Sequence, residues 1–489
     1  MTSLLPIGVG FLLGSVFVIL LGHFDTKWAM AFFLLLGGGT FLLLLSIFEI
    51  KLPDVYLLSA AFMMPVLYDI NFLYRDDPPF FVSANGFGIT AADTLMILLM
   101  AQALIEGFLG RHRKKIRVEY QLPTSLLWFM AALLIINIIS TFFVPYPFYA
   151  ISMIWAQLKA YLVFYFIAMH LNSERTLQRL IYVLVAVMAI QGLIAIEQKF
   201  IGAIFTAERM GIAATLKSQL GSTIITRVSG TFGQPNALAM FINQLIVIAA
   251  FATLTEPRFY RKLLMAGGIG LAILAELFTA SRGGWISLAF AFFVCFVLWQ
   301  SKRGQSVFVS VATVGLGSVF SFGALFAASQ SFRDRLLLDD HGTADVRQPL
   351  MDVAINMMKE NPLTGVGLNH YTYYMAEYDR TMEAIASNYL YPVHNTFLLT
   401  LAETGVLSVI FFVSLLGVMI WTAFKVFQRS SGVIEVMSIG CLGGILSWCV
   451  HNQVDFGSLY QSYPLWLMFG VLMAMDKMTQ AQKPIAKES

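Results

Sequence analysis

Three side chains have the types and the placement that sugar transfer from a lipid diphosphate requires. Arg227 and Arg282 precede two apolar runs of the sequence, and His394 directly precedes a third. A diphosphate leaving group needs no general acid, but its growing negative charge must be stabilised, and arginine offers phosphate a permanently protonated fork of donors. A histidine, with an unperturbed pKa of about 6.5, is suited to take the proton of an acceptor hydroxyl. We therefore expect His394 to be the catalytic base, with Arg282 and Arg227 binding the diphosphate.

The surroundings of these residues separate the functional interpretation from simpler ones. A lone arginine at a membrane surface usually snorkels or binds a lipid headgroup. Arg282 lies in a glycine-flanked turn of a few residues between two apolar runs, which favours a fixed functional position. For Arg227 the two interpretations are balanced, and His394 taken alone is better explained as a cap of the following helix. Arg333 and Arg335 are expected to face solvent or lipid.

Five further residues are candidates for substrate binding. Polar groups inside apolar runs are expensive and therefore functional by default, and others stand beside the residues named above. They are Asn236, Arg347, Asn395, Glu403 and Lys159. No dense cluster of carboxylates indicates a metal, so we expect neither a metal nor a cofactor.

The elements that position these residues are predicted to be membrane-spanning helices. Of 489 residues 58% are hydrophobic and 12% are charged, and the mean hydropathy is +0.75. Soluble domains carry about 25% charged residues, so the composition excludes a soluble protein, and no nucleic-acid partner is expected. About fourteen apolar runs are long enough to span a bilayer. They lie near 4–22, 28–49, 53–69, 88–109, 122–143, 150–171, 180–200, 236–255, 264–280, 283–300, 306–329, 396–424, 436–453 and 461–475.

Lysine and arginine gather in every second connection, which predicts the orientation. By the positive-inside rule both termini are cytoplasmic, in a multi-pass protein of the bacterial inner membrane, and the three motifs face the periplasm. The first apolar run has no basic flank or cleavage site and is interpreted as a retained helix. The three cysteines fall inside predicted spans and indicate neither a disulfide nor a metal site.

Two segments are predicted to project from the outer face. The first, 199–227, is interpreted either as an amphipathic helix lying in the membrane interface or, equally, as a linker. The second, 331–394, contains a predicted helix over 343–361, capped by Thr343 or Asp345, a Gly365-Val-Gly367 turn and a short helix near 369–378. Its apolar stripe predicts that the segment is ordered and docked on the membrane helices.

These elements divide the chain into five predicted regions. They are the N-terminal helices 1–200, the outer segment 201–235, the central helices 236–330 with the Arg282 turn, the long catalytic loop 331–395, and the C-terminal helices with a cytoplasmic tail 396–489.

An ordered set of motifs over residues 225–425 resembles the O-antigen ligase and polymerase superfamily. The motifs are Gly230-Thr-Phe-Gly-Gln-Pro-Asn236, Ser281-Arg-Gly283, Asn361-Pro-Leu-Thr-Gly-Val-Gly367, Val393-His-Asn-Thr-Phe-Leu398 and Glu403-Thr-Gly405. In the family pattern nine residues separate His-Asn from a glycine, and here Gly405 occupies that position. The Gly, Thr or Tyr expected three residues later is Ser408 instead, a small residue that should preserve helix packing.

The resemblance implies an all-α, GT-C-like membrane glycosyltransferase that is independent of metal. Its partners would be the bilayer, an undecaprenyl-diphosphate-linked glycan donor and a glycan or lipid-linked acceptor. The family's histidine is matched by His394, and its diphosphate-binding arginines by Arg227 and Arg282. Because fourteen spans exceed the twelve of a typical ligase, an inverting polysaccharide polymerase is preferred to a ligase that attaches O-antigen to lipid A core.

Two interpretations of other classes remain open. A transporter or flippase of lipid-linked sugars also explains many spans and intramembrane charges, although such proteins usually have repeated halves. The long segment 331–394 has no counterpart in the first half of the chain. A scaffolding membrane protein would tolerate substitution of Arg282.

Overall fold

A computed structural model describes residues 52–66, 69–75, 78–108, 122–201, 215–220, 223–337 and 346–481. The chain divides into two compact units, Met1–Leu58 and Ser59–Ser489. All of the packing discussed below lies within the second unit.

Helices dominate the described residues, because a backbone in lipid must satisfy its own polar groups. The longer helices are α4 (Ala91–Phe108), α5 (Thr124–Ser140), α6 (Pro147–His170), α7 (Glu174–Phe200), α8 (Pro235–Thr255), α9 (Phe259–Thr279), α10 (Arg282–Lys302), α11 (Val307–Ala328), α13 (Arg347–Glu360), α16 (Thr396–Arg429), α17 (Gly432–His451) and α18 (Tyr463–Ala481). The short ones are α3 (Leu52–Met63), α12 (Gln330–Leu337), α14 (Tyr371–Tyr378), α15 (Ile385–Asn388) and the 3₁₀ turn η1 (Leu459–Gln461). Two antiparallel hairpins complete the fold, β1 (Asp69–Tyr74) with β2 (Gly86–Thr90) and β3 (Thr215–Leu220) with β4 (Thr223–Val228).

Eight of the helices in the described residues are long and apolar enough to cross a membrane: α6, α7, α8, α9, α10, α11, α16 and α17. The chain is thus a mostly helical, polytopic membrane protein, as predicted, but the count of fourteen spans is not confirmed. The runs 4–22 and 28–49 lie outside the described residues. The predicted span 53–69 is wrong as a single helix, since α3 ends at Met63 and β1 begins at Asp69.

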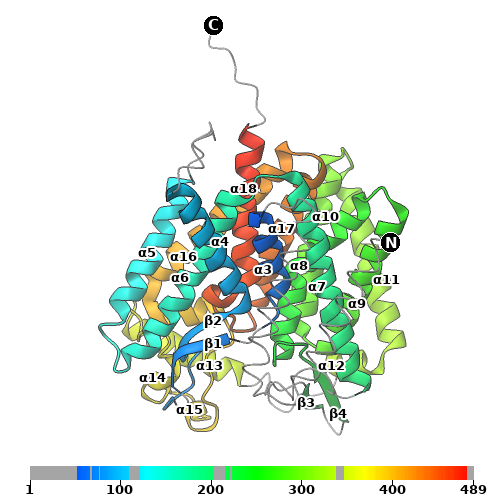
Figure 1. Cartoon of the computed structure of the whole chain (residues 1–489). Coiled ribbons are helices and arrows are strands. Elements are labelled where there is room, and N and C mark those ends of the chain that lie inside the picture. Colours follow the sequence, from blue (N-terminus) through cyan, green and yellow to red (C-terminus); the bar gives the residue numbers. More distant parts are fainter. Residues whose placement is uncertain are drawn as a thin grey trace, which may run out of the picture. The chain divides into compact units, whose positions relative to one another are not determined.

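Helices α8 and α17 form the most enclosed pair of the unit (Figure 1). In their most apolar stretches 83% and 78% of the residues are buried, against 6% in α11. A Cβ on Gly440 would lie 2.5 Å from the Ile248 Cα, and one on Gly444 would lie 2.3 Å from the Gln244 carbonyl oxygen. Small residues let helix backbones approach this closely, and in lipid such packing drives helix association. This pair is the frame against which α10, α16 and α18 pack.

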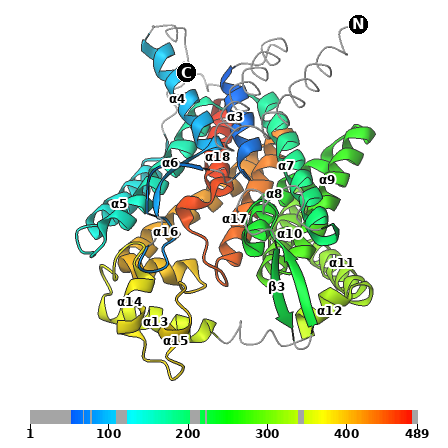
Figure 2. The same ribbon diagram turned by 60° about the horizontal axis from the view of Figure 1, so that its bottom comes forward.

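The long outer segment is docked from Val346 onward, as its apolar stripe predicted. Figure 2 shows α13, α14 and α15 at one end of the helix bundle, the end where α12 and the β3–β4 hairpin also lie. The predicted helix 343–361 is observed as α13, from Arg347 to Glu360, and its expected caps Thr343 and Asp345 lie outside the described residues. Apolar residues of α13 and α14 share one buried cluster with Val393 and Ala402.

The expectation of an amphipathic helix over 199–227 is wrong for its described residues. The helix α7 continues to Phe200, and a paired hairpin occupies Thr215–Val228. The second strand has the sequence Thr-Ile-Ile-Thr-Arg-Val. Five β-branched residues in six disfavour helix and favour a strand, a signal that outweighs the amphipathic pattern.

Candidate functional site

The connection between α9 and α10 fixes Arg282 with only two residues. Ala280 adopts a left-handed backbone conformation, with φ of 51°, and ends α9. The Ser281 hydroxyl then accepts a hydrogen bond from the Gly284 amide at 3.3 Å and caps α10. Arg282 is the first residue of α10 and has almost no freedom to shift along the chain, as its sequence context predicted. A Cβ on Gly283 would lie 3.6 Å from the His451 ring, so the turn packs directly on α17.

Arg227 is tied into the same turn from β4. Its Nε donates to the Thr279 carbonyl at 2.8 Å, and its Nη2 donates to the Asn236 Oδ1 at 2.9 Å. The connection between β4 and α8 is held by Gln198, whose Oε1 accepts from the Gly230 amide at 2.9 Å. Arg227 and Asn236, both predicted from the sequence, are therefore brought together and joined to the Arg282 turn.

Arg335 is a correction to the sequence-based interpretation, which left it in solvent or lipid. It is buried in α12, and its Nε donates to the Ala280 carbonyl at 3.0 Å. Arg227 and Arg335 thus bind the carbonyls of the last residue of α9 and of the residue that caps it, at the end of a helix that attracts cations. Arg333, by contrast, donates to the Phe326 and Ala327 carbonyls at the end of α11.

Arg347 stands at the first position of α13, with a buried Nε that has no hydrogen-bond partner among the described residues. Its charge lowers the pKa of His394 and also acts on Arg227, so it lies near both. Burial lowers the pKa of Arg227 to about 10, and the charges of Arg335, Arg282 and Arg347 lower it as well, while Asp455 raises it. Arg227 therefore lies within electrostatic range of three other guanidinium groups and of the Asp455 carboxylate.

His394 is positioned by ties between the start of α16 and the chain after α17. The Asn395 side chain caps α16 by accepting from the Leu398 amide at 3.0 Å, and it donates to the Gln453 carbonyl at 3.2 Å. The Thr396 hydroxyl donates to the Asn452 Oδ1 at 2.7 Å. These bonds bring His394 beside Phe456, with ring centroids 5.2 Å apart. The Asn395 side chain therefore ties the start of α16 to the loop after α17, and its role in substrate binding stays a prediction.

The electrostatics of His394 suit a base that is neutral at physiological pH. Burial lowers its pKa, Asp455 raises it, and Arg347 lowers it. Its Nδ1 is buried without a hydrogen bond of ordinary geometry. Asp455 also lies 3.8 Å from the Nε2 of the buried His451. Sequence reasoning did not place His451 and Asp455 at the site, although their i, i+4 spacing at the end of an apolar run was a usable signal.

Four of the predicted site residues lie at or next to the start of a helix. Arg282 and Arg347 are the first residues of α10 and α13, Asn236 is the second of α8, and His394 lies two residues before α16. The unpaired amides of a helix N-terminus carry partial positive charge and favour anions. Together with the arginines, they make this end of the bundle suited to a phosphate-bearing ligand.

Glu403 docks the long segment onto α16. Its Oε1 accepts from the Tyr371 amide at 3.2 Å at the start of α14. The amides of Val366 and Gly367 donate to the carbonyls of Ala402 and Glu403 at 2.9 and 2.8 Å, where α16 is interrupted at Gly405. The motifs around Gly365 and Gly405, 40 residues apart, thus pair backbone to backbone.

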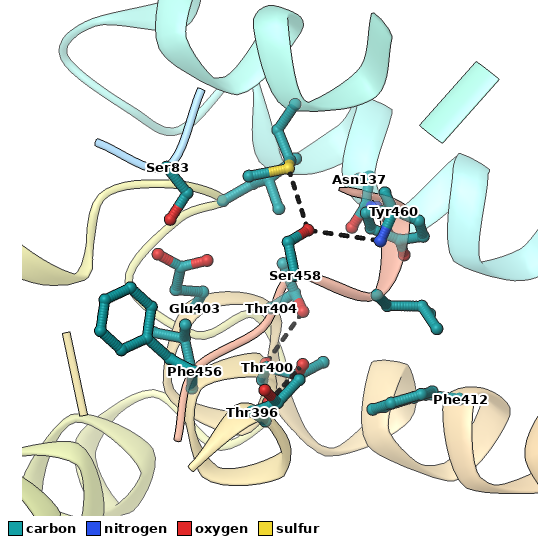
Figure 3. Close-up of a pocket in the computed structure, with 14 residues that line it drawn as sticks. Ser83, Asn137, Thr396, Thr400, Glu403, Thr404, Phe412, Phe456, Ser458 and Tyr460 are labelled. Atoms are coloured by element: carbon teal, nitrogen blue, oxygen red, sulfur yellow. Dashed lines mark hydrogen bonds between the residues drawn. The ribbon is translucent and has the colours of Figure 1, made fainter. Parts of the chain in front are cut away.

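Glu403 also lines a small cavity whose wall combines hydroxyl groups with apolar side chains (Figure 3). Thr396, Thr400, Ser458 and Tyr460 contribute to its wall. The cavity volume is about 50 Å³, which holds a few water molecules and is far below the 300–1,000 Å³ of ordinary ligand sites. The cavity is therefore too small to receive a sugar.

Lys159 is not part of the arginine group. Its Nζ lies 2.7 Å from the Asp93 Oδ2 and donates to the Gly88 carbonyl at 2.8 Å. The pair joins α6 to the start of α4, where Asp93 accepts from the Thr90 amide. Among the described residues no three His, Cys, Asp or Glu side chains gather as metal ligands do.

The fold and this constellation define a polytopic helical membrane protein with a group of arginines at one end of its bundle, of which Arg347 acts on His394. A model of the family described as O-antigen ligase matches residues 267–413, which include Arg282, Arg347, His394 and Glu403. This match confirms the resemblance to the O-antigen ligase and polymerase superfamily for residues 267–413 of the chain. No curated protein matches the sequence.

Proposed function

We propose that the chain is an inverting membrane glycosyltransferase that uses an undecaprenyl-diphosphate-linked glycan as donor. The observation that supports this most directly is that the charges of Arg282, Arg335, Arg347 and Asp455 all act on Arg227, and that Arg347 and Asp455 act on His394 as well. Four cations against one carboxylate favour a multiply charged anion, and the neighbouring histidine is suited to accept a proton.

In the proposed reaction His394 takes the proton from an acceptor hydroxyl. The acceptor oxygen attacks the anomeric carbon, the bond from that carbon to the diphosphate breaks, and its electron pair stays on the departing oxygen. Arg282 and Arg347 stabilise the charge that develops there, while Arg227 and Arg335, already bonded to α9 carbonyls, add to the positive potential. Asp455 stabilises the imidazolium formed in the step.

The test is transfer by the purified protein in lipid nanodiscs, with a defined lipid-linked donor. We expect His394→Ala to lose about 10²–10⁴-fold in rate and Arg282→Ala about 10²–10³-fold. Arg380→Ala is the matched control, since Arg380 lies in the same outer segment, is 64% exposed, and pairs with Glu360 at the surface. Full activity of both site variants refutes the proposal, and flux of the lipid-linked sugar without a covalent product would support a flippase.

We propose a polymerase as the particular activity, on the sequence-based count of apolar runs. The description of the matched family favours the second candidate, a ligase that transfers polysaccharide to lipid A core. One product assay with both acceptors separates them. A polymerase extends a lipid-linked repeat unit, and a ligase modifies only the lipid A core acceptor.

A further inference from the structure

Five aromatic rings close a circuit that begins and ends at His394. Going round, the ring centroids of His394 and Phe456 are 5.2 Å apart, those of Phe456 and Phe81 6.0 Å, and those of Phe81 and Tyr391 5.2 Å. The circuit closes through Tyr391 to Tyr389 at 4.9 Å and Tyr389 to His394 at 6.3 Å. The rings come from three distant parts of the chain, so the fold, rather than sequence proximity, assembles this aromatic circuit.

The circuit is not part of a buried core. Tyr391 is 45% exposed, and each of the other four side chains keeps part of its surface accessible. The phenol oxygens of Tyr389 and Tyr391 have no hydrogen-bond partner in the part of the chain that the structure describes. Partly exposed rings with free hydroxyls form an amphipathic surface that is large, rigid and able to bond polar edges.

Hydrogen bonds and buried packing hold the rings of the circuit in place. The Thr372 hydroxyl donates to the Phe81 carbonyl at 2.5 Å, and the Tyr391 amide donates to the Tyr389 carbonyl at 3.0 Å. Val393 is fully buried between these rings and α16. A preorganised surface of this kind binds without paying much ordering entropy.

Charge separates the two sides of the circuit. Arg347 and Asp455 act on both Tyr389 and His394, so the edge formed by these two rings borders the arginine group. Tyr391 lies beyond that edge, and its ring packs against the rings of Phe81 and Tyr389. An uncharged ligand with an apolar face therefore suits the circuit, whereas the diphosphate suits the arginines.

We propose that the aromatic circuit is the binding site for the acceptor sugar, a pyranose that packs its C–H face on Tyr391 and Phe81 and extends a hydroxyl to His394. A pyranose combines an apolar ring face with a rim of hydroxyls, the complement of partly exposed rings with free phenols. This proposal rests on the proposed transferase function, because it names the acceptor side of the same site.

Binding is measured without donor, so that it does not depend on transfer. The purified full chain in nanodiscs is examined by saturation-transfer difference NMR with the methyl glycosides of glucose, galactose and mannose, and with sorbitol, an acyclic polyol that lacks the rigid C–H face. At least one glycoside should receive saturation mainly on ring protons of one face, and sorbitol should receive little. Equal transfer to sorbitol and to all three glycosides overturns the proposal.

Variants then locate the binding. Tyr391→Ala should weaken glycoside binding by about tenfold, as expected for the loss of one aromatic contact, and Tyr391→Phe should retain most of it. Tyr373→Ala is the matched control, since Tyr373 is 41% exposed in the same outer segment but contacts a different group of rings around Phe80. Unchanged glycoside binding in Tyr391→Ala overturns the proposal. If the variant changes only the insertion of the protein into anionic vesicles, the rings are membrane anchors and the proposal is likewise overturned.

The same variants separate this proposal from the transferase function. Arg282→Ala should lose transfer while keeping glycoside binding, because Arg282 lies in the α9–α10 turn and outside the circuit. Tyr391→Ala should raise the acceptor KM about tenfold with little change in kcat. If transfer occurs but Tyr391→Ala changes neither the acceptor KM nor glycoside binding, the acceptor lies elsewhere and the transferase function still stands.

Discussion

The α9–α10 turn and the outer segment 346–395 deliver charged groups to the same end of the bundle by different means. The turn uses two residues, Ala280 and Ser281, and fixes Arg282 through local backbone geometry. The outer segment carries Arg347 and His394, 47 residues apart in sequence, and depends on docking to α16. A locally built position has few ways to adjust, whereas a docked one is only as fixed as its contacts. The two halves of the site should therefore respond differently to the same kind of change.

The largest effect is expected from charge-conserving substitutions in the two regions. Lysine retains the charge but lacks the planar fork, and the two-residue connection leaves Arg282→Lys no room to restore a lost contact. We expect transfer by Arg282→Lys to fall about 10²-fold. Arg347→Lys should fall only about tenfold, since α13 is carried by packed side chains that can adjust. Equal losses in kcat/KM would contradict the distinction between the two regions.

The second prediction loosens the docked region alone. Gly405 has φ of 80°, and a Cβ there would lie 2.2 Å from the Leu363 carbonyl oxygen. Gly405→Ala should therefore cost about 2–4 kcal/mol of stability through strain and overpacking, and it should lower transfer by separating His394 from the turn. Gly417→Ala in the same helix has nothing within 4 Å of the added Cβ and should be neutral or stabilising by about 1 kcal/mol.

Limited proteolysis of the outer segment and thermal melts measure this difference. Binding of undecaprenyl diphosphate, followed by its thermal stabilisation of the protein, should survive in Gly405→Ala, because Arg227 and Arg282 do not depend on the docking. If Gly405→Ala loses both that stabilisation and the docking of the outer segment, the two regions form one cooperative unit.

The features of this site that could be predicted from the sequence are those set by residues adjacent in the chain. The turn at Arg282, the positive-φ glycines at Gly365 and Gly367, and the helix start at Pro235 and Asn236 all depend on neighbours in the chain. Such features have recognisable residue types at fixed offsets. Most of the membrane helices could likewise be predicted, because a long apolar run by itself indicates a membrane span.

Contacts between residues far apart in the chain could not be predicted from the sequence. Arg335 looks like a surface residue in a polar segment, and only the fold brings it to the Ala280 carbonyl, 55 positions away. The pairing of Asn395 with Gln453, and of Lys159 with Asp93, likewise has no local signature. A polar residue that binds the protein and one that binds a substrate have the same sequence pattern, so both were named as substrate-binding candidates.

The third prediction uses the opposite charges that act on His394. The base must be neutral to accept a proton, so the rate rises with pH through the pKa of His394. Asp455→Asn removes a charge that raises this pKa, and the acidic limb of the pH–rate profile should move to lower pH. Arg347→Gln removes a charge that lowers it, and the limb should move to higher pH. Each shift should be about half a unit to one unit.

Shifts in the same direction for both variants would exclude direct electrostatic action on His394. His370 is an internal control, because it is buried in the same outer segment, is bonded through Nδ1 to the Leu368 carbonyl at 2.8 Å, and has no nearby carboxylate or arginine among the causes of its lowered pKa. Substitution of Asp455 should leave the titration of His370 unchanged in NMR.

The smallest effect on transfer is expected at Lys159, which belongs to neither region. Its removal leaves the Asp93 carboxylate, only 4% exposed, without its cation, and Lys159→Met should therefore lower stability by about 1–3 kcal/mol. The double variant Lys159→Met/Asp93→Asn should recover much of that loss, because no buried charge is then unpaired. Donor and acceptor KM should stay within about twofold of the wild type in both variants, since the pair joins α6 to α4 and the charges acting on His394 come from Asp455 and Arg347. A raised donor KM in the stable double variant would restore Lys159 to the substrate site and extend the cationic group beyond the turn and the outer segment.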